Sequence, residues 1–270
     1  MMFVQFQLIL QYSFLCLFPC LSLSLLFLIG IRYILLVHRL VNGGSVLLPG
    51  AFWFGSVVNS LLVFLPGSAL GTFALELKPA FLLNVPYVIV PLSFLARLAA
   101  ESSSLPPRGN VFCTGPLLCW LLALASLLLA ALSTVRLLAV LSCPLPFAQQ
   151  WLMLEPSLAD PLVYPAMQAL VDFFYRAPAQ LFLAYTLFQR SVSPAARLLA
   201  WLNLGAASQG VFSYSFTAFR APELLDSPIF LDYGRAPLAA LLAILVLTPL
   251  LTVVALELSR PIAISKPKAD

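Results

Sequence analysis

Apolar stretches of about 20 residues recur along the whole chain, and this repetition restricts the fold more than any other feature. A stretch of that length crosses the roughly 30 Å hydrocarbon core of a bilayer as an α-helix. Only 9% of the residues are charged, whereas soluble domains average about 25%. Strands of a membrane barrel would show alternating hydrophobicity rather than continuous apolar runs. The sequence therefore predicts an all-α polytopic membrane protein.

Hydropathy predicts about seven transmembrane helices. They are expected at about 8–31, 46–69, 79–99, 116–141, 161–189, 196–216 and 235–257. The chain opens with "MMFVQFQLIL", which lacks the basic residues that begin a signal peptide, and the apolar run that follows is too long for one. We therefore expect the first span to be an uncleaved membrane anchor.

Basic residues gather in alternate loops. The segments after the first, third, fifth and seventh spans carry two, two, two and three Lys or Arg residues, against one, none and two in the others. The richer set is Arg32, Arg39, Arg97, Arg108, Arg190, Arg197, Arg260, Lys266 and Lys268. Because basic loops stay in the cytosol, this bias predicts an N-terminus outside the cytosol and a cytosolic C-terminus.

The last five residues, "KPKAD", place Lys266 and Lys268 at positions −5 and −3 from the end. This is the spacing of a dilysine retrieval signal, which cytosolic coat proteins read as an address. A solvated basic tail is the alternative interpretation. Since the C-terminus is predicted to be cytosolic on independent grounds, we expect retrieval to the endoplasmic reticulum membrane.

Four polar residues recur every fourth position in the fifth predicted span, which places them on one helix face. They are Gln168, Asp172, Arg176 and Gln180. An ionisable group at membrane depth is costly and marks a functional site by default. One interpretation is an i,i+4 ion pair that also bonds to neighbouring helices. The other, compatible with it, is the polar wall of a cavity in which Asp172 binds a cationic or hydroxylated ligand.

Charged and polar residues elsewhere give weaker predictions. Arg136 lies near the outer end of the fourth span, on the same side as Glu155 and Asp160, so we expect a charge cluster there. Snorkelling of Arg136 toward the interface is the alternative. Asn59 and Asn203 either join helices or line the cavity, and we favour joining helices.

Several chemistries are not expected. The five cysteines form no CxxC pair, and the one histidine lies at a span end, which disfavours a metal site or a histidine-activated nucleophile. We find no phosphate loop and no dinucleotide glycine motif, so we expect no cofactor. The basic residues form no patch, so we do not expect a nucleic-acid partner.

Two segments carry motifs of a known family of membrane proteins. The first is "FWFGSVVNSLLVFLPGSALGTFALELKPAFLLNVPYVIVP" (52–91), similar to that family's G-S…VF-x-x-G-x-x-x-G…E-x-x-P-A-F…I-P-Y segment. The second is "RLLAVLSCPLPFAQQWLMLEPSLADPLVYPAMQALVDFFYRAP" (136–178), similar to R-G-L…L-D-C-P…EPYL-x-DP-x-x-YP-x-x-Q…FY-x-x-P. The matching residues in the second segment are Arg136, Cys143, Glu155, Asp160, Pro161, Tyr164, Pro165, Gln168, Tyr175 and Pro178. The segments stand in the family's order, and through them the chain resembles the transmembrane 6 superfamily.

The resemblance implies the EXPERA fold, a four-helix membrane unit shared with emopamil-binding sterol isomerases and the sigma-2 receptor. Members of the superfamily carry two such units. Here the second unit is expected at 116–257, while 46–115 holds only two spans of the first. An anchor and cytosolic loop (1–45) precede them, and a cytosolic tail (258–270) follows. This departure predicts a truncated or alternatively started form.

Asp172 is the informative departure, because the superfamily usually has an uncharged residue there. The sigma-2 branch has an acid at this position, in "E-L-V-F-Q-L-P" aligned with "DFFYRAP". The sterol isomerases use intramembrane acids together with a histidine. No histidine lies inside a predicted span of this chain, so the resemblance disfavours an isomerase.

The function implied is that of a non-enzymatic lipid-handling protein of the endoplasmic reticulum, involved in neutral-lipid or lipoprotein loading and cholesterol balance. A sterol or other lipid would bind beside Gln168, Asp172 and Arg176. Two alternatives stay open. In the first, the protein is an enzyme that isomerises a sterol double bond, with Asp172 as the acid and base. In the second, it is a trafficking or assembly partner whose outer loop, 142–165, docks a lumenal protein. Expected partners are membrane lipids, a lumenal or membrane protein, and coat proteins at the dilysine tail.

Overall fold

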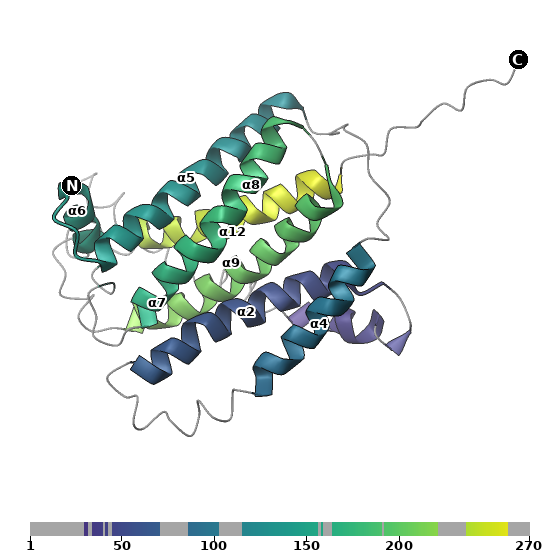
Figure 1. Ribbon diagram of the computed structural model, residues 1–270. Helices are drawn as coiled ribbons and strands as arrows, with labels where there is room; N and C mark the ends of the chain where they lie inside the picture. The colour runs from purple at the N-terminus through teal and green to yellow at the C-terminus, as the bar shows by residue number, and fades with distance from the viewer. Residues whose placement is uncertain are drawn as a thin grey trace, which may run out of the picture.

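The structure is a computed structural model of the 270-residue chain. It describes residues 30–31, 34–39, 41–42, 45–70, 86–102, 115–155, 158, 164–190, 192–220 and 236–258. Every regular element within these ranges is helical (Figure 1). The prediction of an all-α protein is therefore confirmed.

Three of the described helices are long and apolar enough to cross a membrane. They are α2 (Leu47–Leu70), α5 (Pro116–Val140) and residues Ala240–Glu257 of α12 (Ala236–Glu257). They coincide with the second, fourth and seventh predicted spans, and they confirm a membrane protein with several apolar helices. Most of the first predicted span, 8–31, lies outside the described residues.

Helices also occupy the described parts of the remaining predicted spans. These are α4 (Pro86–Ser102) in the third span and α9 (Pro194–Arg220) in the sixth. The fifth span contains α7 (Tyr164–Val171), a π-helical turn η2 (Asp172–Arg176) and α8 (Ala177–Phe188) in direct succession. A short helix, α6 (Pro146–Leu154), stands in the predicted outer loop.

The π turn has a cause in the sequence "DFFYRAP". Proline has no N–H, so Pro178 cannot donate to the carbonyl four residues back, and its ring crowds that carbonyl in a regular α-helix. The preceding Ala177 N–H instead reaches back five residues, to the carbonyl of Asp172. A π turn relieves the crowding and is one of the known responses of a helix to local strain.

Helices α2 and α9 lie side by side in Figure 1, and their backbones approach each other closely. A Cβ atom added at Gly55 would lie 2.0 Å from the carbonyl oxygen of Leu202, and one at Gly205 would lie 2.0 Å from that of Phe52. The Ser56 hydroxyl lies 3.0 Å from the carbonyl oxygens of both Phe52 and Gly205. Small residues therefore bring the two backbones into direct contact, as in other membrane helix pairs.

One apolar core joins α2 to the helices that follow residue 115. Its largest members are Phe52, Leu122, Leu183, Leu187, Trp201, Leu204 and Leu256. α4 packs on the outside of α2, where the rings of Trp53 and Phe94 meet edge to face at 5.4 Å. The helices of the expected EXPERA-like unit and the expected remnant before them thus share a core.

Candidate functional site

Asp172, the first residue of η2, accepts hydrogen bonds from three side chains. Nη1 of Arg176 donates to Oδ1 at 2.8 Å and Nε2 of Gln168 donates to the same oxygen at 3.0 Å. Arg136 of α5 donates through Nη1 to Oδ2. The predicted ion pair between Asp172 and Arg176 is confirmed. The carboxylate is 2% exposed, so these donors replace water as its partners.

Arg136 joins this site to the outer end of the bundle. Its Nε and Nη2 atoms donate to the two carboxylate oxygens of Glu155, at 3.0 and 2.7 Å. The Trp151 indole N–H donates to Glu155 as well, at 2.8 Å. The expected cluster of Arg136 with Glu155 is confirmed, while Asp160 lies outside the described residues.

Two arginines and two carboxylates therefore form one buried, charge-balanced group, here called the ionic network. Its members are Arg136, Glu155, Asp172 and Arg176. The sequence predicted two separate features, a cluster at the membrane boundary and a stripe within the bilayer. Arg136 unites them, because its planar guanidinium holds Glu155 bidentately and still has a donor for Asp172.

Uncharged groups from α2 and α12 complete the surroundings of the network. The side-chain amides of Gln168 and Asn59 exchange hydrogen bonds at 3.3 and 3.4 Å. Nη2 of Arg176 donates to the backbone carbonyl of Leu245 at 3.3 Å. The prediction that Asn59 joins helices is confirmed. For Asn203 it is not, because its buried side-chain amide has no hydrogen-bond partner among the described residues.

The polar stripe lies against other helices. The cavity beside it, lined by Arg136, Gln168, Asp172 and Arg176, measures about 10 Å³, roughly what one water molecule requires. Gln180 is buried one turn further on, and its amide nitrogen has no hydrogen-bond partner among the described residues. Direct contact between this stripe and a lipid stays a prediction.

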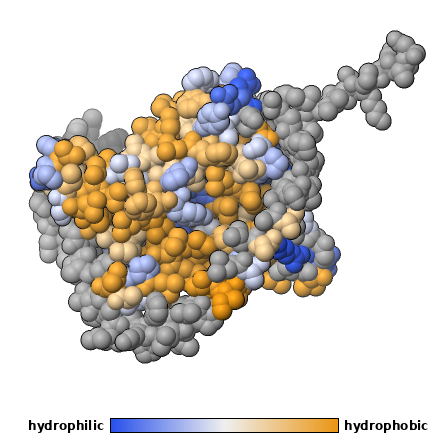
Figure 2. All heavy atoms as spheres, viewed as in Figure 1, coloured by the Kyte–Doolittle hydropathy of each residue, from blue (hydrophilic) through white to orange (hydrophobic). Residues whose placement is uncertain are grey.

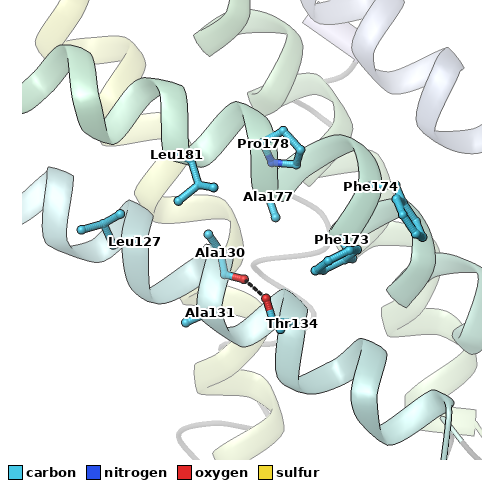
Figure 3. Close-up of a pocket in the computed structure, with 9 residues that line it drawn as sticks. All are labelled: Leu127, Ala130, Ala131, Thr134, Phe173, Phe174, Ala177, Pro178 and Leu181. Carbon is cyan, nitrogen blue, oxygen red and sulfur yellow. Dashed lines mark hydrogen bonds between the residues drawn. The ribbon is translucent and has the colours of Figure 1, made fainter.

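The larger cavity is a groove on the outside of the bundle, between α5 and the helix formed by η2 and α8 (Figure 3). It measures about 400 Å³, and its lining residues are Leu127, Ala130, Ala131, Thr134, Phe173, Phe174, Ala177, Pro178 and Leu181. We call it the α5–α8 groove. No lining residue is charged, and most are apolar.

The groove opens outward, since Phe174 and Leu181 are 69% and 51% exposed. The surface that α5 and α8 form is mostly hydrophobic in Figure 2. Thr134 is the one lining residue with a polar side-chain group, and its hydroxyl donates to the carbonyl of Ala130 at 3.1 Å. The groove therefore faces the position that membrane lipid would occupy.

The sequence did not predict this groove. Its components are alanines of α5 and the phenylalanines of η2, and each is ordinary in an apolar helix. Pro178, in "FYRAP", was a usable signal for the irregular turn. The apposition of α5 and α8, however, depends on packing between segments about 45 residues apart.

A second, partly buried ion pair joins α9 to α12. Nη2 and Nε of Arg197 donate to the two carboxylate oxygens of Glu257 at 2.6 and 3.2 Å, and the Trp201 indole N–H donates to Glu257 at 3.0 Å. The sequence places Arg197 among the basic residues of a cytosolic loop, yet its side chain is buried in the first turn of α9.

Two further sets of predicted residues have separate outcomes. Lys266 and Lys268 of the predicted retrieval signal lie outside the described residues. Tyr164 of the family motif is the first residue of α7.

The residues that could bind a metal ion are scattered within the described ranges. There, no three His, Cys, Asp or Glu side chains gather closely enough to hold a metal ion. Of the two described cysteines, Cys119 is buried and Cys143 is partly buried.

Comparison with known proteins identifies relatives over part of the chain. The model of the family described as Transmembrane 6 superfamily member 2-like, transmembrane domain, matches residues 10–108. This range begins inside the expected anchor segment, 1–45. Transmembrane 6 superfamily member 2 of Rattus norvegicus is 37% identical over 150 residues, which cover 51% of this chain and 39% of the relative. The Homo sapiens protein of the same name is 34% identical over 152 residues, with the same coverage.

The chain thus aligns with about two fifths of the length of these relatives. No solved structure matches it. The family match and the relatives agree with the resemblance carried by the two motif segments, and over the matched residues the chain is similar to the transmembrane 6 superfamily.

Proposed function

We propose that this protein is a non-enzymatic membrane protein of the endoplasmic reticulum that binds a neutral lipid, such as a sterol, in the α5–α8 groove. The observation that carries the proposal is the groove itself, with a volume of about 400 Å³ and an uncharged lining. That volume falls within the range of roughly 300–1,000 Å³ for small-molecule sites. The groove opens toward the hydrophobic surface, from which a lipid would enter.

The lining favours an uncharged lipid over a phospholipid head group or a fatty-acid carboxylate. No charged residue lines the groove, and in the ionic network each arginine already faces a carboxylate. An anionic group in the groove would lose hydration without gaining a cation. The Thr134 hydroxyl donates to Ala130, but its oxygen still has capacity to accept a hydrogen bond. A lipid with a single hydroxyl group satisfies that acceptor.

The ionic network has a supporting role in this proposal. Asp172 and Arg176 bound the π turn that holds Phe173 and Phe174 in the groove wall. Catalysis by Asp172 finds less support, because its oxygens accept from three donors and the adjoining cavity has space for about one water. We therefore retain the non-enzymatic function over the isomerase. The family resemblance supports a role in neutral-lipid or lipoprotein loading and cholesterol balance.

Filling the groove tests the proposal. Ala131→Trp places a large ring between α5 and α8, and we expect labelling by a photoreactive sterol probe to fall about tenfold, equivalent to about 1.4 kcal/mol of binding free energy. Leu128→Trp is the matched control, since Leu128 is also exposed on α5 but does not line the groove. Equal labelling of both variants, or labelling that excess unlabelled sterol does not compete, would refute a sterol site here.

The proposed location rests on Lys266 and Lys268. Replacing both with alanine removes the spacing that coat proteins read, so we expect the protein to move from the endoplasmic reticulum to later compartments. Fluorescence microscopy of the full chain with organelle markers measures this shift. Replacing Lys78 with alanine is the control, because it removes a charge without touching the tail. Unchanged distribution of the double variant would remove the retrieval signal from the proposal.

A further inference from the structure

Helix α6 follows α5 after five intervening residues and carries no charged side chain. The stretch from Leu137 to Leu154 contains no Lys, Arg, Asp or Glu. Several large apolar residues in and before α6 are nevertheless exposed. They are Leu141, Leu145, Phe147, Met153 and Leu154. Such a concentration of exposed apolar side chains marks an interaction surface.

One face of α6 is fixed to the end of the bundle, where Figure 1 places this helix near the end of α5. Trp151 and Leu152 pack against a small cluster formed by Ala139, Leu158 and Ala169. Glu155 follows α6 directly and pairs with Arg136. The helix therefore has a defined orientation, and its other faces point away from the protein.

The exposed faces differ in polarity. Residues in a helix advance about 100° each, so Phe147 and Leu154, seven apart, lie within about 20° of each other. By the same geometry, Gln149 lies about 200° from Phe147. All three are exposed. One flank of α6 thus carries Phe147 and Leu154, and the opposite flank carries Gln149 together with the exposed Met153, about 40° from it. The exposed Gln150 lies between the two flanks.

We propose that α6 lies in the head-group boundary of the leaflet in which α5 ends, with Phe147 and Leu154 among the acyl chains and Gln149 toward water. Chain continuity supports a lipid surface as the partner, because α5 is a membrane-crossing helix and only five residues separate it from α6. Interfacial helices insert an apolar flank in this way, and the burial of large apolar side chains stabilises their binding to the membrane. This inference does not depend on the groove or its ligand.

The position of α6 has a consequence for the ionic network. Trp151 and Glu155 connect the interfacial helix to Arg136, which in turn holds Asp172. The leaflet boundary and the π turn are therefore joined by one continuous set of hydrogen bonds. A lumenal protein docked on α6 is the competing possibility, and it requires the apolar flank to face water when no protein partner is present.

Spin labels measure the depth of each flank. Single cysteines at Phe147, Leu154 and Gln149, in the full chain with its native cysteines replaced, receive a nitroxide after reconstitution in phosphatidylcholine nanodiscs. We expect labels at 147 and 154 to lie about 5–10 Å inside the head-group boundary. These two labels collide with oxygen more than with a nickel chelate, and the label at 149 does the reverse. Equal nickel accessibility at all three sites, or the deepest label at 149, overturns the proposal.

A second measurement uses the unmodified sequence and so does not depend on the folding of the cysteine-free chain. Phosphatidylcholine with a photoreactive group near the head-group end of its acyl chain is incorporated into the same nanodiscs, and labelled peptides are identified by mass spectrometry. We expect adducts on Phe147 or Leu154 of α6. Adducts on α5 with none on α6 would overturn the interfacial placement.

Discussion

Asp172→Leu is expected to destabilise the folded protein by about 3–5 kcal/mol, the usual cost of removing one partner from a buried ion pair. Arg136 keeps its bidentate partner Glu155, so the loss falls on Arg176. Without Asp172, the described contacts of Arg176 reduce to the Leu245 carbonyl at 3.3 Å, and a buried guanidinium stays uncompensated. Thermal unfolding of the purified protein in nanodiscs measures the loss as a lower Tm.

The double variant Asp172→Leu/Arg176→Met separates charge balance from shape. It removes one positive and one negative charge, and the remaining pair, Arg136 with Glu155, is neutral. Replacing a buried ion pair by apolar residues is often neutral for stability or better. We therefore expect the double variant to unfold at a higher temperature than Asp172→Leu. A double variant no more stable than the single one would show that the network is not held together by charge compensation.

The second large effect is expected at the contact between α2 and α9. Gly205→Ala places a methyl group 2.0 Å from the backbone carbonyl oxygen of Phe52, so the helices must separate. Overpacking of this kind costs about 1–3 kcal/mol, or more when backbone atoms are involved. The hydrogen bond from Ser56 to the Gly205 carbonyl weakens as well. We expect a lower Tm and weaker cross-linking between cysteines placed in α2 and α9.

Gly67→Ala is the matched control for that substitution. Gly67 also lies in α2, but a Cβ atom there meets nothing within 4 Å. Alanine in a helix interior is favoured over glycine by about 0.5–1 kcal/mol, so this variant is expected to be at least as stable as the natural protein. If Gly205→Ala and Gly67→Ala have the same Tm, the close packing of α2 on α9 is not a major source of stability.

This contact also bears on the organisation of the chain. The motif segments divide the sequence at residue 115 into a remnant of one unit and a complete second unit. In the fold, α2 supplies Phe52 to the shared core and Asn59 to the surroundings of Asp172. We therefore expect α2 to be required for a stable fold of the helices after residue 115.

Features governed by local spacing were predicted from the sequence. Apolar runs of sufficient length predicted the helices, since an unpaired backbone is not tolerated in the bilayer core. The i,i+4 spacing of Asp172 and Arg176 predicted their ion pair, because residues four apart are neighbours on a helix surface. The motif segments predicted the superfamily. Each conclusion needs only the chain within a few turns of the residues concerned, or its likeness to known sequences.

The tertiary structure decided which distant residues meet. Arg136 donates a hydrogen bond to Asp172, which lies 36 residues further along the chain. Gly205 contacts Phe52, although more than 150 residues separate them in the sequence. The α5–α8 groove forms only when these two helices have a particular rotation toward each other. Helical periodicity defines a polar or apolar face, but it does not specify the neighbour that the face contacts. That choice depends on the combined packing of all the helices. For this reason the polar stripe of the fifth span was visible in the sequence, while its partner on α5 and the groove on the adjoining face were not.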